Sequence, residues 1–528
     1  MFASSFELTH TPHDGAKPRQ STVFYNFAAR MNVLLPLVLL LCVARLWLMP
    51  LSSSFWVDEM GTAFVVHYGA AHPSLAAAPQ VPQSIYYWLP RAAEALFGFS
   101  EISYRLPSVL AMAIVLFLTG RLAARLIYPQ AAWFAPIACL ALRGVNDQAA
   151  DARPYALGAA IAAASLLFLV RWLDSGNKRN AALFILFAAA LWRVQLVFWP
   201  FYGVYALYVF ARLARRTARA SWPQVAVVFA LLGLALAPVL VHALALFREA
   251  NAHVIAQAPS VYNLARSLKL GLIAVCGGGA WLLSRLFRWP SNRKLPSWDS
   301  LVLIVSWWFC QPVCLFGFSW LTGNSLFVAR YLYLGLPGAA LAATAAAAYF
   351  IRPASWRPLS VVLAAGVLLY LGQWSVPWPP HHNSDWRAAA REVNALARGD
   401  DTPVLCPSPF IEAKPPAWRP DYSLPGFLYA QLPVYPIHGK TYLFPFESSP
   451  EAKQYAASLS HEALSASGRF ILYGGDRIVR FWREWFAAQP EFANWQNRRA
   501  GPFGDVDVVV FERRFSESSV RDRARTPN

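Results

Sequence analysis

Carboxylates are scarce in the first 380 residues of the chain, where only 11 Asp and Glu occur. The adjacent pair Asp58-Glu59 lies in the stretch FWVDEMGTAFVV, between aromatic and apolar neighbours. In such surroundings an ionised carboxylate is costly unless it has a partner or a chemical task. One task is to accept or orient a proton as a general base. The structural alternative is a first-turn helix acid that offsets the helix dipole.

Arginines stand beside the remaining polar motifs. Asp151 and Arg153 occur in DARPYAL, Arg105 in SYRLPS, and Arg330 with Tyr331 in ARYLYLGLP, each at the start of an apolar run. Helix-dipole compensation by Asp151 and snorkelling of Arg330 towards headgroups are the structural alternatives. A guanidinium is also a natural partner for phosphate, so convergence of these arginines would form a phosphate site.

Neither a metal centre nor a disulfide framework is expected. Five of the six cysteines lie in apolar runs and the sixth is alone in the tail, which is typical of small buried residues: Cys42, Cys139, Cys276, Cys310, Cys314 and Cys406. The histidines of the first 380 residues show no metal-ligand spacing. We therefore expect no metal and no cofactor.

The elements that must position these residues are membrane helices. The chain of 528 residues is 57% hydrophobic and 14% charged, whereas soluble proteins carry roughly 25% charged residues. A membrane span needs about 20 apolar residues. Eleven such runs occur, near 31–49, 106–126, 131–146, 154–173, 181–196, 197–212, 224–246, 266–287, 300–321, 328–350 and 356–376. They predict a mainly α, polytopic membrane protein with about eleven transmembrane helices.

The excess of positive charge marks topology and does not indicate a nucleic-acid partner. Residues 1–380 carry 28 Lys and Arg against 11 acids, whereas the rest of the chain carries 18 against 17. Short cytoplasmic loops collect Lys and Arg, and the arginine-rich loops fit a cytoplasmic N-terminus. With an odd number of spans, the C-terminal part would then lie on the opposite side.

Four regions are expected. Residues 1–30 form a cytoplasmic tail, and residues 31–379 form the transmembrane domain with an outer loop at 50–104 that holds interfacial helices. After the proline-rich SVPWPPHHNSDWR, residues 380–515 form a small extramembrane α/β domain with a helix near 385–398 and strands in TPVLCP, GRFILYGG and DVDVVVFER. Residues 516–528 read as disordered.

A family resemblance spans most of residues 50–400. The segments FWVDE, SIYYWLPRAAEALFGFSEISYRLPSVL, DARPYAL, RYLYLGLP and DWRAAAREV resemble, in that order, GT-C membrane glycosyltransferases. The nearest pattern is that of the protein O-mannosyltransferase and lipid A aminoarabinose transferase group. The resemblance implies a GT-C-like fold in the bacterial inner membrane, with the C-terminal domain in the periplasm.

The resemblance also implies a reaction. A hexose or pentose carried on a polyprenyl phosphate would be transferred, with inversion, to a lipid, surface-glycan or protein acceptor. Asp58 would be the base, with Glu59 as its supporting neighbour and Asp151 as a further catalytic carboxylate. Arg105, Arg153 and Arg330 would hold the donor phosphate or orient the carboxylates, and Tyr155 and Tyr331 would line the site.

Two other classes of function are compatible with the sequence. A transporter or flippase of lipid-linked sugars would also have polar clusters among many helices, although inverted repeats and helices broken near the midplane, which are usual in transporters, are not apparent. A non-catalytic scaffold that binds polyprenyl phosphate would need the arginines but not Asp58.

Overall fold

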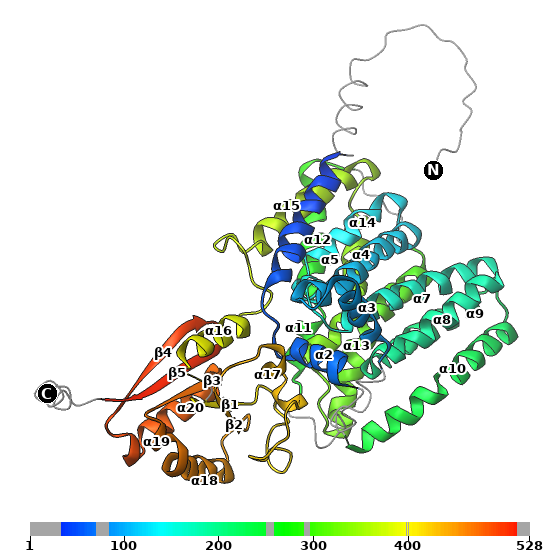
Figure 1. Ribbon diagram of the computed structural model, residues 1–528. Helices are drawn as coiled ribbons and strands as arrows, with labels where there is room; N and C mark the ends of the chain where they lie inside the picture. The colour runs from blue at the N-terminus through cyan, green and yellow to red at the C-terminus, as the bar shows by residue number, and fades with distance from the viewer. Residues whose placement is uncertain are drawn as a thin grey trace, which may run out of the picture.

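The computed structural model describes residues 33–69, 84–249, 258–289, 296–397, 399 and 401–514. A bundle of helices forms the larger part, and a smaller α/β part lies at one end of it (Figure 1). The expected cytoplasmic tail at 1–30 and the expected disordered segment at 516–528 lie outside the described residues, and so does part of the loop at 50–104.

Within the described residues, eight helical segments are long and apolar enough to cross a membrane, and a pair bent by 49° would make a ninth. The eight are Val33–Ser52, α4 (Glu101–Leu126), α7 (Tyr155–Ser175), Leu196–Ala214 with α9 (Phe201–Ala214), Trp222–Val241 in α10 (Trp222–Glu249), α13 (Trp298–Thr322), Ala329–Ala348 with α14 (Leu336–Ala348), and Pro353–Leu371 with α15 (Trp356–Leu371). The bent pair is α11 (Val261–Ser267) and α12 (Leu270–Leu286). The chain is thus a multi-pass membrane protein.

The expected number of eleven spans is not confirmed. The run predicted at 131–146 forms two short helices, α5 (Phe134–Leu140) and α6 (Arg143–Ala149), of seven residues each. Each is about 10 Å long, which is too short to cross a bilayer alone. Helix α8 (Lys178–Val194), with 17 residues, falls just below the length of a typical span.

The described parts of the loop at 50–104 contain two complete α-helices, in line with the interfacial helices expected there. They are α2 (Val57–Tyr68) and α3 (Trp88–Phe97). Helix α3 exposes Trp88, Leu96 and Phe97, and an exposed apolar face of this kind suits a helix that lies in a membrane surface.

The C-terminal part is built on a five-stranded sheet in the order β2-β1-β3-β5-β4. The strands are β1 (Pro403–Pro407), β2 (Lys440–Phe444), β3 (Arg469–Gly475), β4 (Trp495–Phe503) and β5 (Val506–Arg513). Strand β1 is parallel to β2 and β3, while β5 is antiparallel to β3 and β4. Among the helices of this part are α16 (Trp386–Leu396), α18 (Pro450–Leu459) and α20 (Asp476–Ala487).

The sequence predicted strands β1, β3 and β5 and helix α16 but did not predict β2 and β4. Strand β4 reads WQNRRAGPF and is mostly exposed or half-buried. Such an edge strand carries little of the apolar pattern by which strands are predicted.

Buried and partly buried polar contacts join the sheet part to the helical bundle. The hydroxyl of Tyr435 donates to Glu101 Oε1 (2.8 Å) and accepts from the backbone N–H of Phe55 (2.8 Å). Arg387 donates to the carbonyl of Ser52 (2.8 Å) and to Glu101 Oε1 (3.1 Å). These contacts tie the sheet part to the end of the first span and to the start of α4.

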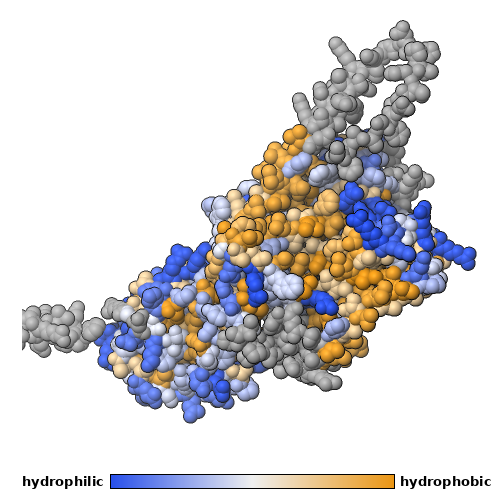
Figure 2. All heavy atoms as spheres, turned by 45° about the vertical axis from the view of Figure 1, so that its right-hand side comes forward, coloured by the Kyte–Doolittle hydropathy of each residue, from blue (hydrophilic) through white to orange (hydrophobic). Residues whose placement is uncertain are grey.

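Apolar residues gather over the helical bundle and hydrophilic residues over the sheet part (Figure 2).

Candidate active site

Glu59, in the first turn of α2, is the centre of a buried group of hydrogen bonds, here called the Glu59 clamp. Arg105 Nε donates to Glu59 Oε1 over 2.7 Å, and Arg105 Nη2 pairs with Glu59 Oε2. The same carboxylate accepts from the backbone N–H groups of Ala152 (2.8 Å) and Trp56 (3.2 Å). Burial alone would raise the pKa of Glu59, but the guanidinium of Arg105 holds it below its ordinary value. The clamp therefore fixes α2, α4 and the segment before α7 to one another.

Arg105 belongs to this clamp and not to an open anion site. Its side chain is fully buried, and besides Glu59 it donates to the carbonyls of Leu51 (2.9 Å) and Ser53 (2.6 Å). With its donors used in this way, it cannot also hold a donor phosphate. Of the two roles expected for Arg105, its position is compatible only with orientation of a carboxylate.

Asp58 lies beside the other two predicted arginines. Its Oδ2 atom is 2.9 Å from Arg330 Nη1 and 3.9 Å from Arg153 Nη2. Arg153 also donates to the backbone carbonyl of Asp58 (3.0 Å). Arg153 precedes α7, and Arg330 lies in the 3-10 helix η8 (Ala329–Gly335) that leads into α14. Two of the three predicted arginines thus meet Asp58 here, and the third, Arg105, pairs with Glu59.

Several polar atoms of this cluster are buried without a hydrogen-bond partner among the described residues. They are the Nε atoms of Arg153 and Arg330 and the hydroxyl of Tyr155. The Arg330 guanidinium lies 5.5 Å from the ring of Tyr331, whose ring is 6.3 Å from that of Tyr155. Buried polar groups are normally paired. Cationic donors without partners, framed by two tyrosines, are the arrangement that an anionic group can bind.

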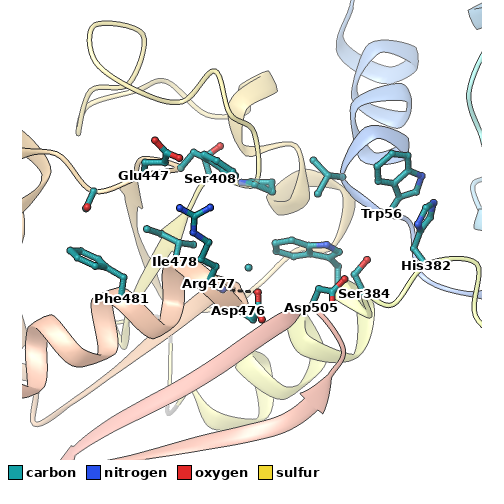
Figure 3. A pocket seen from close by; sticks show the side chains of 16 residues that line it. Trp56, His382, Ser384, Ser408, Glu447, Asp476, Arg477, Ile478, Phe481 and Asp505 are labelled. Carbon is teal, nitrogen blue, oxygen red and sulfur yellow. Dashed lines mark hydrogen bonds between the residues drawn. The ribbon is translucent and has the colours of Figure 1, made fainter. Parts of the chain in front are cut away.

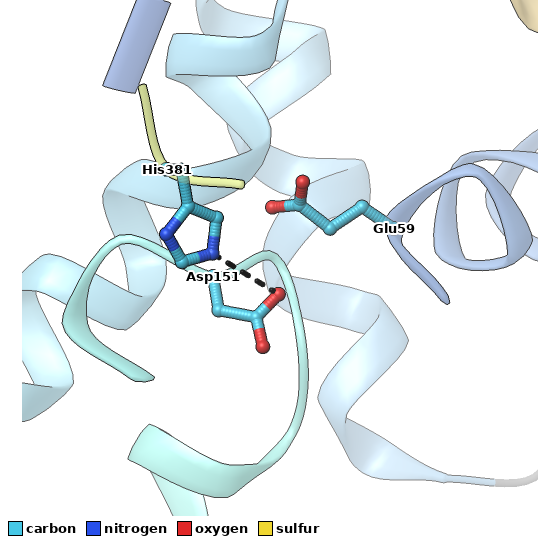
Figure 4. Close-up of side chains that lie close together, drawn as sticks. All are labelled: Glu59, Asp151 and His381. Carbon is cyan, nitrogen blue, oxygen red and sulfur yellow. Dashed lines mark ion pairs between the residues drawn. The ribbon is translucent and has the colours of Figure 1, made fainter. Parts of the chain in front are cut away.

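Asp151 has different neighbours from Asp58. Its Oδ1 atom accepts from the indole N–H of Trp56 (3.0 Å) and lies 3.8 Å from His381 Nε2 (Figure 4). Burial raises the pKa of Asp151, and the nearby charge of Glu59 acts in the same direction. Asp151 thus contacts the histidine and tryptophan beside the Glu59 clamp, not the arginines that pair with Asp58.

Glu59, Asp151 and His381 each offer one ligand atom within 4.8 Å of the others, a spacing that could hold a metal ion. Both oxygens of Glu59 already accept two hydrogen bonds each. A carboxylate has about four lone-pair sites, so an ion could bind Glu59 only by displacing one of its donors. The absence of a metal requirement stays a prediction.

Trp56, Tyr86 and His381 belong to the site but were not identified as site residues from the sequence. The hydroxyl of Tyr86 is buried without a hydrogen-bond partner among the described residues. Burial raises the pKa of Tyr86, and its charged form would interact with Asp151 and Arg153. The available signals were the Tyr-Tyr pair in SIYYW and the His-His pair before NSDWR, but neither showed that the side chain faces the carboxylates.

Known proteins resemble this chain over part of its sequence and in its fold. Residues 82–242 match the family described as dolichyl-phosphate-mannose-protein mannosyltransferase. Two crystal structures of ArnT from Cupriavidus metallidurans share the fold. The one bound to undecaprenyl phosphate has a TM-score of 0.52 at 10% identity, covering 90% of this chain and 97% of ArnT. The apo structure has a TM-score of 0.52 at 13% identity, covering 92% and 98%. No curated protein sequence matches the chain. The resemblance to GT-C membrane glycosyltransferases is confirmed.

Proposed function

We propose that the chain is a glycosyltransferase that moves a sugar from a polyprenyl-phosphate donor to an acceptor hydroxyl at the outer face of the inner membrane. The observation that carries the proposal is the cluster of Asp58, Arg153 and Arg330, in which two guanidiniums keep unpartnered donors beside one carboxylate. The ArnT structure with bound undecaprenyl phosphate supports the choice of donor, because its fold is shared.

The cluster supplies what an inverting transfer needs. The acceptor oxygen forms a bond to the anomeric carbon of the sugar while the bond from that carbon to the phosphate oxygen breaks. The polyprenyl phosphate leaves with the electron pair, and Arg153 and Arg330 stabilise its negative charge. The acceptor proton passes to the carboxylate of Asp58. Tyr155 and Tyr331 line the site, while Glu59 and Arg105 position α2 and Asp151 orients Trp56.

The outer location rests on topology. The carboxylates and the sheet part lie at the same end of the bundle, because Glu101 at the start of α4 contacts Tyr435 and Arg387. Arginines gather at the opposite ends of α4, α7 and α9, where Arg125 and Arg212 pair with Asp174. Cytoplasmic loops collect such arginines. We therefore place the N-terminus in the cytoplasm and the α/β domain from residue 380 in the periplasm.

Asp58→Asn tests the proposal. We expect it to lower the transfer of radiolabelled sugar from polyprenyl-phosphate donors by about 100-fold or more, the usual contribution of a general base. The assay follows the labelled product with purified protein. Asp421→Asn is the matched control, because that side chain is 80% exposed in the sheet part, and it should transfer at the normal rate.

Three results would contradict the proposal. Equal turnover of Asp58→Asn and the unchanged chain would remove Asp58 as the base. Donor binding without consumption would favour a scaffold. Movement of the lipid-linked sugar across the membrane with no bond broken would favour a flippase.

A further inference from the structure

A cavity of about 530 Å³ lies between the sheet part and the start of α2 (Figure 3). This volume is within the range of small-molecule sites, roughly 300 to 1,000 Å³. The cavity opens at the carboxyl ends of the parallel strands. Ser408 directly follows β1, Glu447 lies shortly after β2, and Gly475 ends β3. Ligands of α/β sheets commonly bind at this edge.

The walls of the cavity combine aromatic rings with hydrogen-bond acceptors. Trp56, Trp386, Phe446 and Phe481 supply rings, and three serines supply hydroxyls: Ser384, Ser408 and Ser448. Rings that pack against the apolar faces of a sugar, with polar groups that take its hydroxyls, are complementary to a carbohydrate.

The charges of the cavity argue against a phosphorylated ligand. Three carboxylates line it, from Glu447, Asp476 and Asp505, against the single guanidinium of Arg477. Burial and the neighbouring His381 lower the pKa of His382 to about 3, so this imidazole adds no positive charge at neutral pH. Carboxylates accept hydrogen bonds from hydroxyl or ammonium groups and repel phosphate.

The cavity adjoins Asp151 and the start of α2 through Trp56. Trp56 lines the cavity, and its indole N–H donates to Asp151 (3.0 Å). The ring of His382 lies 4.3 Å from that of Trp56. Val57 also lines the cavity, and Asp58 is the next residue along α2. A ligand in the cavity would therefore lie against the first turn of α2, the helix that carries Asp58.

We propose that this cavity binds the acceptor, and that the acceptor is an uncharged or amino-bearing oligosaccharide that presents a hydroxyl towards Asp58. That the bound oligosaccharide is the acceptor rests on the proposed transferase function. Binding of an oligosaccharide by the cavity can be tested without turnover.

The test is direct binding of soluble oligosaccharides to the full chain in detergent. A glycan array of uncharged, amino-bearing and phosphorylated oligosaccharides gives the preferred class, and calorimetry with the best binder gives its Kd. We expect the best binder to be uncharged or amino-bearing. Phe481→Ala and the nearly isosteric Asp476→Asn should each weaken its binding by about 10-fold or more. Ile411→Ala and Glu484→Gln are the matched controls outside the cavity lining, and they should leave the Kd unchanged.

The outcomes separate this proposal from the transferase function. Tightest binding of a phosphorylated oligosaccharide, no binding by any array member, or a Kd unchanged in both cavity variants would overturn the cavity proposal, even if transfer dependent on Asp58 persists. Oligosaccharide binding that both cavity variants weaken, in a protein that transfers no sugar, would instead keep the cavity site and remove the transferase function.

Discussion

The two neighbouring acids at the start of α2 have different surroundings. Successive residues of a helix point about 100° apart, so Asp58 and Glu59 face different groups. Glu59 is buried and accepts hydrogen bonds from three residues, whereas Asp58 remains 18% exposed beside two arginines. Breaking a buried ion pair such as that of Glu59 with Arg105 typically costs about 3–5 kcal/mol. Glu59 and Arg105 thus hold α2 in place, whereas the carboxylate of Asp58 keeps contact with solvent, as the proposed base requires.

Arg330 should matter through its geometry as well as its charge. Arg330→Lys keeps a cation but loses the planar fork that matches phosphate oxygens. We expect kcat/KM for the polyprenyl-phosphate donor to fall by about 10-fold in Arg330→Lys, and by about 100-fold or more in Arg330→Ala. Steady-state kinetics with varied donor concentration measures both effects. Arg419→Lys, at a highly exposed position, is the control. A donor kcat/KM that both Arg330 variants leave intact would exclude Arg330 from the phosphate site.

At the scale of elements, the short helix α6 brings a carboxylate into the bundle. Burial raises the pKa of Asp147 to about 6 from its ordinary value of 3.8, although His381 and Arg143 oppose the change. Between pH 3.8 and about 6, the carboxyl of Asp147 is mostly protonated in the folded chain but mostly ionised in the unfolded chain. The contribution of Asp147 to stability is therefore largest at low pH and is lost as the pH rises through about 6.

Asp147→Asn, which resembles the protonated acid, tests this dependence. We expect the Tm of Asp147→Asn minus that of the unchanged chain to be several degrees higher at pH 8 than at pH 4. Thermal unfolding in detergent across this range measures the difference. Asp421→Asn, at an exposed position, should show no such trend. A difference that does not change with pH would contradict the raised pKa of Asp147.

At the scale of the whole molecule, Tyr435 forms one of the joints between the sheet part and the bundle. Tyr435 donates to Glu101 and accepts from the N–H of Phe55, three residues before Asp58. A shift of the sheet part, which forms most of the cavity, would therefore also move the segment that leads to the proposed base.

Tyr435→Phe removes the hydrogen bonds that the hydroxyl makes with Glu101, Phe55 and Ser54 while keeping the ring. We expect faster hydrogen exchange at the backbone of residues 50–56 and several-fold slower transfer, because the buried N–H of Phe55 loses its partner and Glu101 loses one of its two donors while keeping Arg387. Exchange measured by mass spectrometry and the transfer assay report the two effects. The control, Tyr442→Phe on strand β2, should leave both unchanged. Unaltered exchange at 50–56 in Tyr435→Phe would show that the joint does not depend on this hydroxyl.

The sequence alone predicted the features that depend on local pattern. Apolar runs of span length predicted a multi-pass helical membrane protein, and the alternation and turns of the tail predicted β1, β3, β5 and α16. Asp58, Arg153 and Arg330 also stood out as site candidates, because charged residues next to apolar runs need a partner.

Tertiary structure decided which of these residues meet. Arg105, Arg153 and Arg330 precede or begin apolar runs in similar ways, but only packing places Arg105 beneath Glu59 and the other two beside Asp58. The cavity is formed by α2 together with segments that follow residue 380. Contacts between segments this far apart depend on how whole helices and strands pack, and no local pattern records that packing.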